Sequence, residues 1–288
     1  MDSLLKYLLP IWLAALPLFL QPPTLAAQQQ SLAPLVDSDL QTATPSVSPT
    51  RPPLIVIGFA GGFIRRTNTV HGEIALALQL SKEYGTRIHT EIFENHHGNQ
   101  AHREILRLLH LYNSKPSSSS AAGTAPAPSS SEPTQVPRII LYGHSWGASE
   151  AVAVARRLQH DGIPVQLLAE VDGVPKRQQD DSIVPSNVAQ AINFYQDEGL
   201  LHGRATIHAA NPRVTHILGN VHLSYKHHDV ACTRYPWFAR TFMHRHIEIE
   251  NDPRVWNQIE ALILSNLPSQ SQPKKDPATT PTASTRAL

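Results

Sequence analysis

Apolar and polar residues follow one another along this chain in short runs that predict strands and helices by turns. Apolar and β-branched runs predict buried strands at 54–57, 138–142 and 165–171, and alternation predicts a further strand at 87–93. Helix-forming spacing predicts helices at 70–84, 99–113 and 148–158. Strands that alternate with helices indicate an α/β fold, with a mostly parallel β-sheet and helices on both faces.

The last third of the chain adds further elements. We expect a helix at 187–197 and strands at 205–208 and 214–218. Asp252 and Pro253 predict the start of a last helix, with the aspartate as N-cap and the proline in the first turn. Ile259, Leu262 and Ile263 give this helix an apolar face.

The first 27 residues have the pattern of a secretory signal. Lys6 precedes a hydrophobic run from about Leu8 to Leu20, and small residues at 25–27 offer a cleavage site. The run has about 13 residues, short of the roughly 20 that span a bilayer, so we expect cleavage rather than a retained membrane anchor. The sequence therefore predicts an exported protein, in a bacterial periplasm or outside the cell.

Composition sets the domain boundaries. Residues 28–50 are polar with scattered proline and predict a disordered linker, residues 114–137 predict a disordered Ser/Pro/Ala-rich insertion, and residues 268–288 predict a disordered tail. One domain, 51–267, remains. The net charge is +1 and no basic block stands out, so nucleic acid is not an expected partner. Cys232 is the single cysteine, which excludes an intrachain disulfide and a cysteine-based metal cluster.

The most specific motif is Gly143-His144-Ser145-Trp146-Gly147, which has the form G-x-S-x-G. It lies between a predicted strand and a predicted helix, the context in which a serine is held on a tight turn at the carboxyl edge of a parallel sheet. In this motif and context the chain resembles the α/β-hydrolase superfamily, in particular its lipases, esterases and thioesterases. The resemblance spans about residues 51–267 and implies an α/β-hydrolase fold with Ser145 as the nucleophile.

The superfamily's chain order places an acid after the serine and a histidine later still. Asp172 follows the strand at 165–171 and is our candidate acid; Asp180 and Asp181 in the next loop stay open, and Asp229 is a more distant alternative. His246 precedes the last helix and is our candidate base, with His244 as the alternative.

An oxyanion hole needs two backbone donors. The N–H of Trp146, at the start of a helix, is the expected first donor. The second should come from the glycine-rich loop 58–62, from Phe59 or Ala60. That loop matches neither a dinucleotide nor a P-loop pattern, so no cofactor is expected. The histidine pairs lack a recognised ligand spacing, and we expect no metal.

These residues predict a serine hydrolase that cleaves carboxylic esters, or thioesters, through a Ser-His-Asp triad and an acyl-enzyme. Its partner would be a small-molecule or lipid ester, with an apolar acyl or alcohol group suggested by Phe59, Phe63 and Trp146. Acyl transfer to an acceptor other than water would use the same residues. The alternative from another class is a non-catalytic envelope protein of the same fold that binds a ligand or partner.

Overall fold

A computed structural model describes residues 52–113, 136–176 and 180–268. All of the described residues belong to one compact unit. The expected signal at 1–27, the linker at 28–50, nearly all of the insertion and the tail beyond 268 lie outside the described residues. Among the described residues, no helix is long and apolar enough to cross a membrane.

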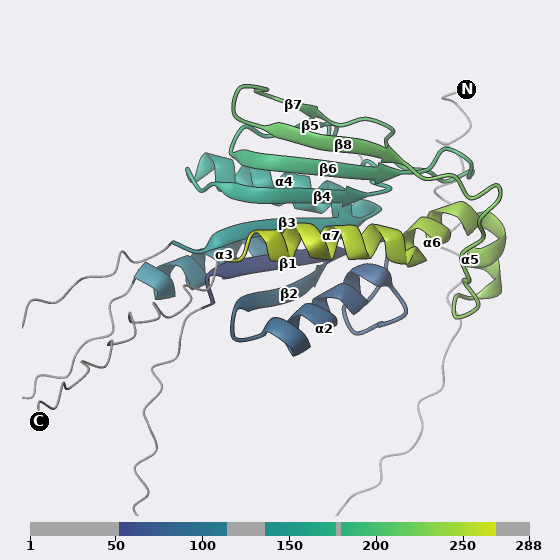
Figure 1. Ribbon diagram of the computed structural model, residues 1–288, viewed down its shortest axis with the longest axis horizontal. Helices are drawn as coiled ribbons and strands as arrows, with labels where there is room; N and C mark the ends of the chain where they lie inside the picture. The colour runs from purple at the N-terminus through teal and green to yellow at the C-terminus, as the bar shows by residue number, and fades with distance from the viewer. Residues whose placement is uncertain (1–51, 114–135, 177–179, 269–288) are drawn as a thin grey trace, which may run out of the picture. The chain divides into compact units, whose positions relative to one another are not determined.

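A six-stranded sheet forms the centre of the unit (Figure 1), and every neighbouring pair of strands is parallel. In spatial order its strands are β2 (Ile88–Glu94), β1 (Leu54–Ala60), β3 (Arg138–His144), β4 (Val165–Val171), β6 (Val188–Tyr195) and β8 (His216–His222). The chain builds from β1 to one edge, then reverses and builds toward the other. Open α/β sheets bind ligands beyond the carboxyl ends of the strands at such a reversal.

Helices cover both faces of the sheet. One face carries α3 (Gly98–Asn113) and α4 (Trp146–His160), and the other carries α2 (Gly72–Tyr84) and α7 (Pro253–Ser265). Residues of β1 alternate between the two hydrophobic clusters: Ile55 and Ile57 pack on the α3–α4 side, and Leu54 and Val56 on the α2–α7 side. Both sides are fully buried, which explains the unbroken apolar run in the sequence.

The other elements lie at the margins of the sheet. A two-stranded parallel sheet pairs β5 (Ile183–Val184) with β7 (His208–Ala209). Two short helices, α5 (Trp237–Phe242) and α6 (His244–Asn251), lie beyond the carboxyl ends of the strands, at the right in Figure 1. This is the edge at which the sequence predicts the site.

Most of the predicted elements are confirmed. The start of α7 is as expected: Asp252 Oδ1 accepts a hydrogen bond of 2.9 Å from the backbone N–H of Arg254, and Pro253 is the first helical residue. The helix predicted at 187–197 is wrong, because this segment is β6, paired on both sides with β4 and β8. The strand predicted at 205–208 reduces to β7, and the strand predicted at 214–218 begins at 216 and runs to 222 as β8.

Candidate active site

Ser145 occupies the sharp turn between β3 and α4. Its backbone angles are φ 55° and ψ −124°, which a residue with a side chain adopts only when the surroundings enforce them. Its N–H donates to Val171 O at 2.9 Å and its carbonyl accepts from Ala148 N at 3.1 Å. A Cβ at Gly147 would lie 2.2 Å from Phe59 O, so glycine is required where α4 begins. Contacts with β1 and β4, the two strands beside β3, therefore hold the turn in place.

Asp172 lies one strand over, directly after β4, and it too has a positive φ, 42°. Its carboxylate is fully buried. One oxygen, Oδ1, accepts from Gly203 N at 2.7 Å and from Gln196 N at 3.4 Å. The other, Oδ2, accepts from Gln196 Nε2 at 2.9 Å and faces His246 Nδ1 at 2.7 Å.

Burial opposes the charged form of Asp172 and acts to raise its pKa. The hydrogen bond and charge of His246, with the hydrogen bonds from Gln196 and Gly203, outweigh burial and hold the pKa of this carboxyl below its ordinary value. Asp172 is therefore an anion near neutral pH, as an acid that orients a histidine must be.

His246 lies in α6, not in a loop, and its side chain is 2% exposed. The bond to Asp172 fixes its Nδ1 and leaves Nε2 for other partners. The alternative base, His244, has a side chain that is 45% exposed and lies near Glu248. The structure thus brings Asp172 to His246 and leaves His244 at the surface.

The alternative acids are engaged elsewhere. Asp181 is buried and bonds Ser149 and Arg204. Asp180 is exposed and bonds Ser182, and Asp229 is exposed and pairs with Arg245.

His144, which was not among the residues predicted for the site, lies next to Ser145 in the chain and against the ring of His246. Its ring lies 4.5 Å from the ring of His246, centroid to centroid, and it is the residue before Ser145. Burial lowers the pKa of His144 to about 4, so this ring is neutral near pH 7. Within the described part of the chain, no hydrogen bond joins Ser145 to His246; in free enzymes such bonds are often long and tighten only when substrate binds.

The oxyanion donors were expected at Trp146 and in loop 58–62. Trp146 is the first residue of α4, so its N–H has no acceptor within the helix. Phe59 is fully buried and paired on both sides, whereas Ala60 ends β1 and pairs only with β2, which leaves it the better placed of the two. The next residue, Gly61, lies against the serine: a Cβ there would be 3.2 Å from Ser145 Cβ.

Aromatic side chains stand near this edge. Phe63 is 87% exposed, and its ring meets that of Trp146 edge-on at 5.5 Å. Phe59, in contrast, lies in the core and cannot line a substrate pocket. On α5, the side chains of Trp237 and Phe242 are also exposed.

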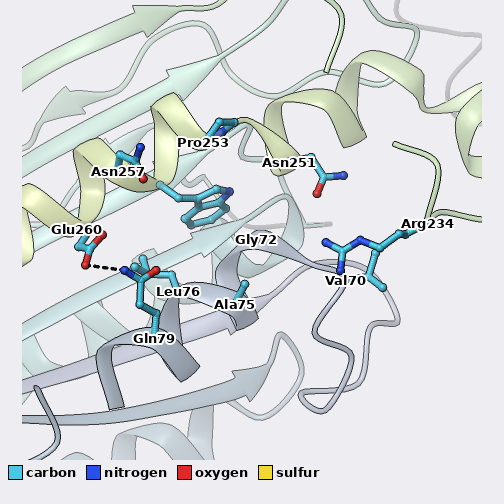
Figure 2. A pocket seen from close by; sticks show the side chains of 11 residues that line it. Val70, Gly72, Ala75, Leu76, Gln79, Arg234, Asn251, Pro253, Asn257 and Glu260 are labelled. Atoms are coloured by element: carbon cyan, nitrogen blue, oxygen red, sulfur yellow. Dashed lines mark hydrogen bonds between the residues drawn. The ribbon is translucent and has the colours of Figure 1, made fainter. Parts of the chain in front are cut away.

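A pocket of about 230 Å³ opens between α2 and the start of α7 (Figure 2). Its lining includes Gly72, Leu76, Arg234, Asn251 and Trp256. Neither Ser145, Asp172 nor His246 is among the lining residues, so this pocket is not assigned to the substrate of the serine.

No protein-family model and no curated protein matches the chain. Among solved structures, it is similar to the RedJ thioesterase from the prodiginine pathway of Streptomyces coelicolor, with 11% identity and a TM-score of 0.36, over 78% of this chain and 96% of that one. It is also similar to a protein described as a hydrolase of the α/β superfamily from Xanthomonas campestris pv. campestris, with 14% identity and a TM-score of 0.30, over 72% of this chain and 98% of that one.

Likeness at these TM-scores carries no assignment. The fold is assigned from the chain's own geometry: the turn that holds Ser145 joins the central parallel strand β3 to α4, and Asp172 and His246, which share a hydrogen bond, come after it in that order along the chain. The chain therefore has the fold of the α/β-hydrolase superfamily.

Proposed function

We propose that the protein is a serine hydrolase that cleaves carboxylic esters through an acyl-enzyme on Ser145. One observation carries the proposal: a buried Asp172–His246 hydrogen bond of 2.7 Å lies at the same sheet edge as a serine held in a strained strand-to-helix turn. A serine hydroxyl is a weak nucleophile at neutral pH and needs such an oriented base.

In the proposed reaction, Ser145 Oγ attacks the acyl carbon while His246 Nε2 takes the hydroxyl proton. Asp172 keeps the ring of His246 oriented and stabilises its protonated form. The backbone N–H groups of Trp146 and Ala60 would donate to the oxyanion. Collapse of this intermediate breaks the ester C–O bond, and the proton on His246 passes to the leaving alcohol. Water, activated by the same histidine, then releases the acid and restores the serine.

We favour a small-molecule or lipid ester with an apolar group. The exposed Phe63 beside Trp146 supports this choice, as do the exposed aromatics of α5, the helix next to the one that holds His246. The proposal includes export, which rests on the signal-like pattern of residues 1–27.

The test is labelling of the purified protein with a fluorophosphonate probe, followed by peptide mass spectrometry. We expect an adduct on Ser145 that is lost in His246→Gln and kept in the matched control His244→Gln, whose side chain is exposed. Turnover of a chromogenic ester should fall by roughly 10³-fold or more in Ser145→Ala. The intact mass of protein collected outside the cytoplasm also reports whether residues 1–27 have been removed.

Wild-type protein that is folded but neither labelled nor active on esters would overturn the proposal. The alternative, a non-catalytic binding protein of this fold, would then account for the absence of a described hydrogen bond between Ser145 and His246. Transfer of the acyl group to an added alcohol, rather than to water, would identify the same site as an acyltransferase.

A further inference from the structure

Three ionisable side chains meet inside the protein on the α2 side of the site. His71 and Glu73 come from the start of α2, and Glu250 comes from α6. One ligand atom of each lies within 4.8 Å of the other two, and the residues are 6%, 0% and 2% exposed. His71 Nδ1 contacts Glu250 Oε1 directly. Two carboxylates this close and this dry repel each other unless one of them is protonated or a positive charge lies between or beside them.

Among the described residues, polar atoms around this cluster lack hydrogen-bond partners. Glu73 Oε2, both ring nitrogens of His144 and the hydroxyl of Tyr235 are buried without a hydrogen bond. His144 is 3% exposed, and its Nδ1 points to Glu250 Oε1 at 3.5 Å without bonding it. The ring of Tyr235 stands edge-on to that of His71 at 5.2 Å. Buried polar groups normally form hydrogen bonds, so several unsatisfied groups in one place point to a bound group.

We propose that His71, Glu73 and Glu250 bind a divalent transition-metal ion, with His144 or Tyr235 available as a further ligand. Imidazole nitrogen with carboxylate oxygen is the donor set that zinc and its neighbours take in proteins. The two carboxylates balance the charge of a dication in a place that water does not reach.

The ion would be enclosed and structural. Gly72 and Asn251, which adjoin the three ligands in sequence, line the pocket of Figure 2, but none of the three ligand residues does. Glu73 Oε1 also accepts from Gly61 N at 3.2 Å, and Gly61 lies against Ser145. The ion would thus fix the loop beside the serine and the ring that packs on His246. The site does not depend on the proposed hydrolysis, and its test does not use activity.

The test is zinc stoichiometry. Full-length protein, purified without a metal-affinity tag and stripped with a chelator, is titrated with Zn²⁺ against a chromophoric competitor, and bound metal is measured by mass spectrometry. We expect about one tightly bound ion per chain and a rise in Tm of several degrees, since a ligand that binds only the folded state stabilises it. Glu73→Gln, which keeps the side-chain shape, should lose this one equivalent.

The matched control is His96→Gln. His96 belongs to a group with the half-buried Glu94 and the exposed His97 that also brings ligand atoms together. This variant should keep the tight equivalent. Wild-type protein that binds less than about a tenth of an equivalent would overturn the proposal, as would Glu73→Gln that keeps the ion or His96→Gln that loses it. If Glu73→Gln does not fold, Glu250→Gln replaces it, and the wild-type stoichiometry decides by itself.

Discussion

At the scale of single residues, the candidate acid is held by a loop that lies well after it in the chain. Three of the four contacts to the carboxylate of Asp172 come from Gln196 and Gly203, and only the fourth is His246. Gly203 fits so closely that a Cβ on it would lie 2.2 Å from the backbone carbonyl carbon of Asp172. The position of Asp172 therefore depends on Gly203, a residue with no side chain to take part in a reaction.

This dependence gives a prediction for Gly203→Ala. The added methyl group must displace the backbone of Asp172 and disturb its contact with His246, so we expect kcat for ester cleavage to fall at least tenfold. Overpacking of this kind should also lower the free energy of unfolding by about 1–3 kcal/mol. Steady-state kinetics and urea denaturation measure the two effects. The control is Gly219→Ala in β8, where the nearest atom would be 3.6 Å away; equal effects in both variants would contradict the assignment.

The chain order of a known motif is enough to rank candidate residues after Ser145. The sequence favoured Asp172 over Asp181, and the structure places Asp172, not Asp181, against His246. It could not reach His71, Glu73 and Glu250, since His71 and Glu250 are 179 residues apart and no local pattern marks such a meeting. Convergence of this kind is a property of the folded sheet edge.

At the scale of elements, α5 is unusual for a surface helix. Ala239 faces the protein and packs near Ile247 of α6, while Trp237 and Phe242 remain 68% and 54% exposed. Arg240 adds a positive charge to the same helix. Exposed aromatics next to the helix of His246 suit contact with the apolar part of a substrate.

We therefore expect the double variant Trp237→Ser, Phe242→Ser to lose activity selectively. The kcat/KM for an emulsified long-chain ester should fall about tenfold, while that for a soluble short-chain ester should stay within twofold, because only the long ester extends over α5. Leu111→Ser, which removes a comparably exposed residue from α3, is the control and should change neither. A parallel loss on both esters would indicate damage to the site rather than lost contact.

A helix, strand or turn could be predicted where the sequence contains a signal for both its type and its ends. The Asp252–Pro253 start of α7 and the glycine-bounded serine turn are such signals. The segment 187–197 has none, because a strand buried between two neighbours shows no alternation, and its alanines and glutamine are as common in helices. His246 was expected before the last helix; it lies there, within the short helix α6, which the sequence did not predict.

At the scale of the whole molecule, the α/β class and the parallel sheet were predictable from the alternation of strands and helices. The strand order was not, because it depends on which strands pair across crossovers. One buried group in the sheet also affects global stability. Glu170 of β4 is 1% exposed, and one of its oxygens has no hydrogen-bond partner in the described part of the chain.

Burial, and then the nearby charge of Asp181, raise the pKa of Glu170 well above its ordinary value against the opposing effect of Arg204 and Arg156. The folded protein therefore keeps this proton as the pH rises above about 4.5, while the unfolded chain releases it. Stability is lost as the pH rises toward the folded pKa, by about 1.4 kcal/mol for each unit of the shift.

Glu170→Gln removes this titration. We expect the variant to gain free energy of unfolding relative to the wild type at pH 8 and to gain much less at pH 5. Urea denaturation at the two pH values measures the difference. A gain of the same size at both would show that packing, not the proton, is responsible.

The all-parallel sheet also sets the order of events as the protein forms. In the main sheet, no strand can pair with the strand that follows it in the chain through a tight hairpin. Each parallel pair forms only after the whole crossover segment between its two strands has been made. The acid and the histidine are 74 residues apart, and the histidine lies in the last part of the described chain. On the proposed mechanism, a nascent chain that has formed its serine turn still lacks the base, and it stays inert until nearly all of the domain has been made and folded.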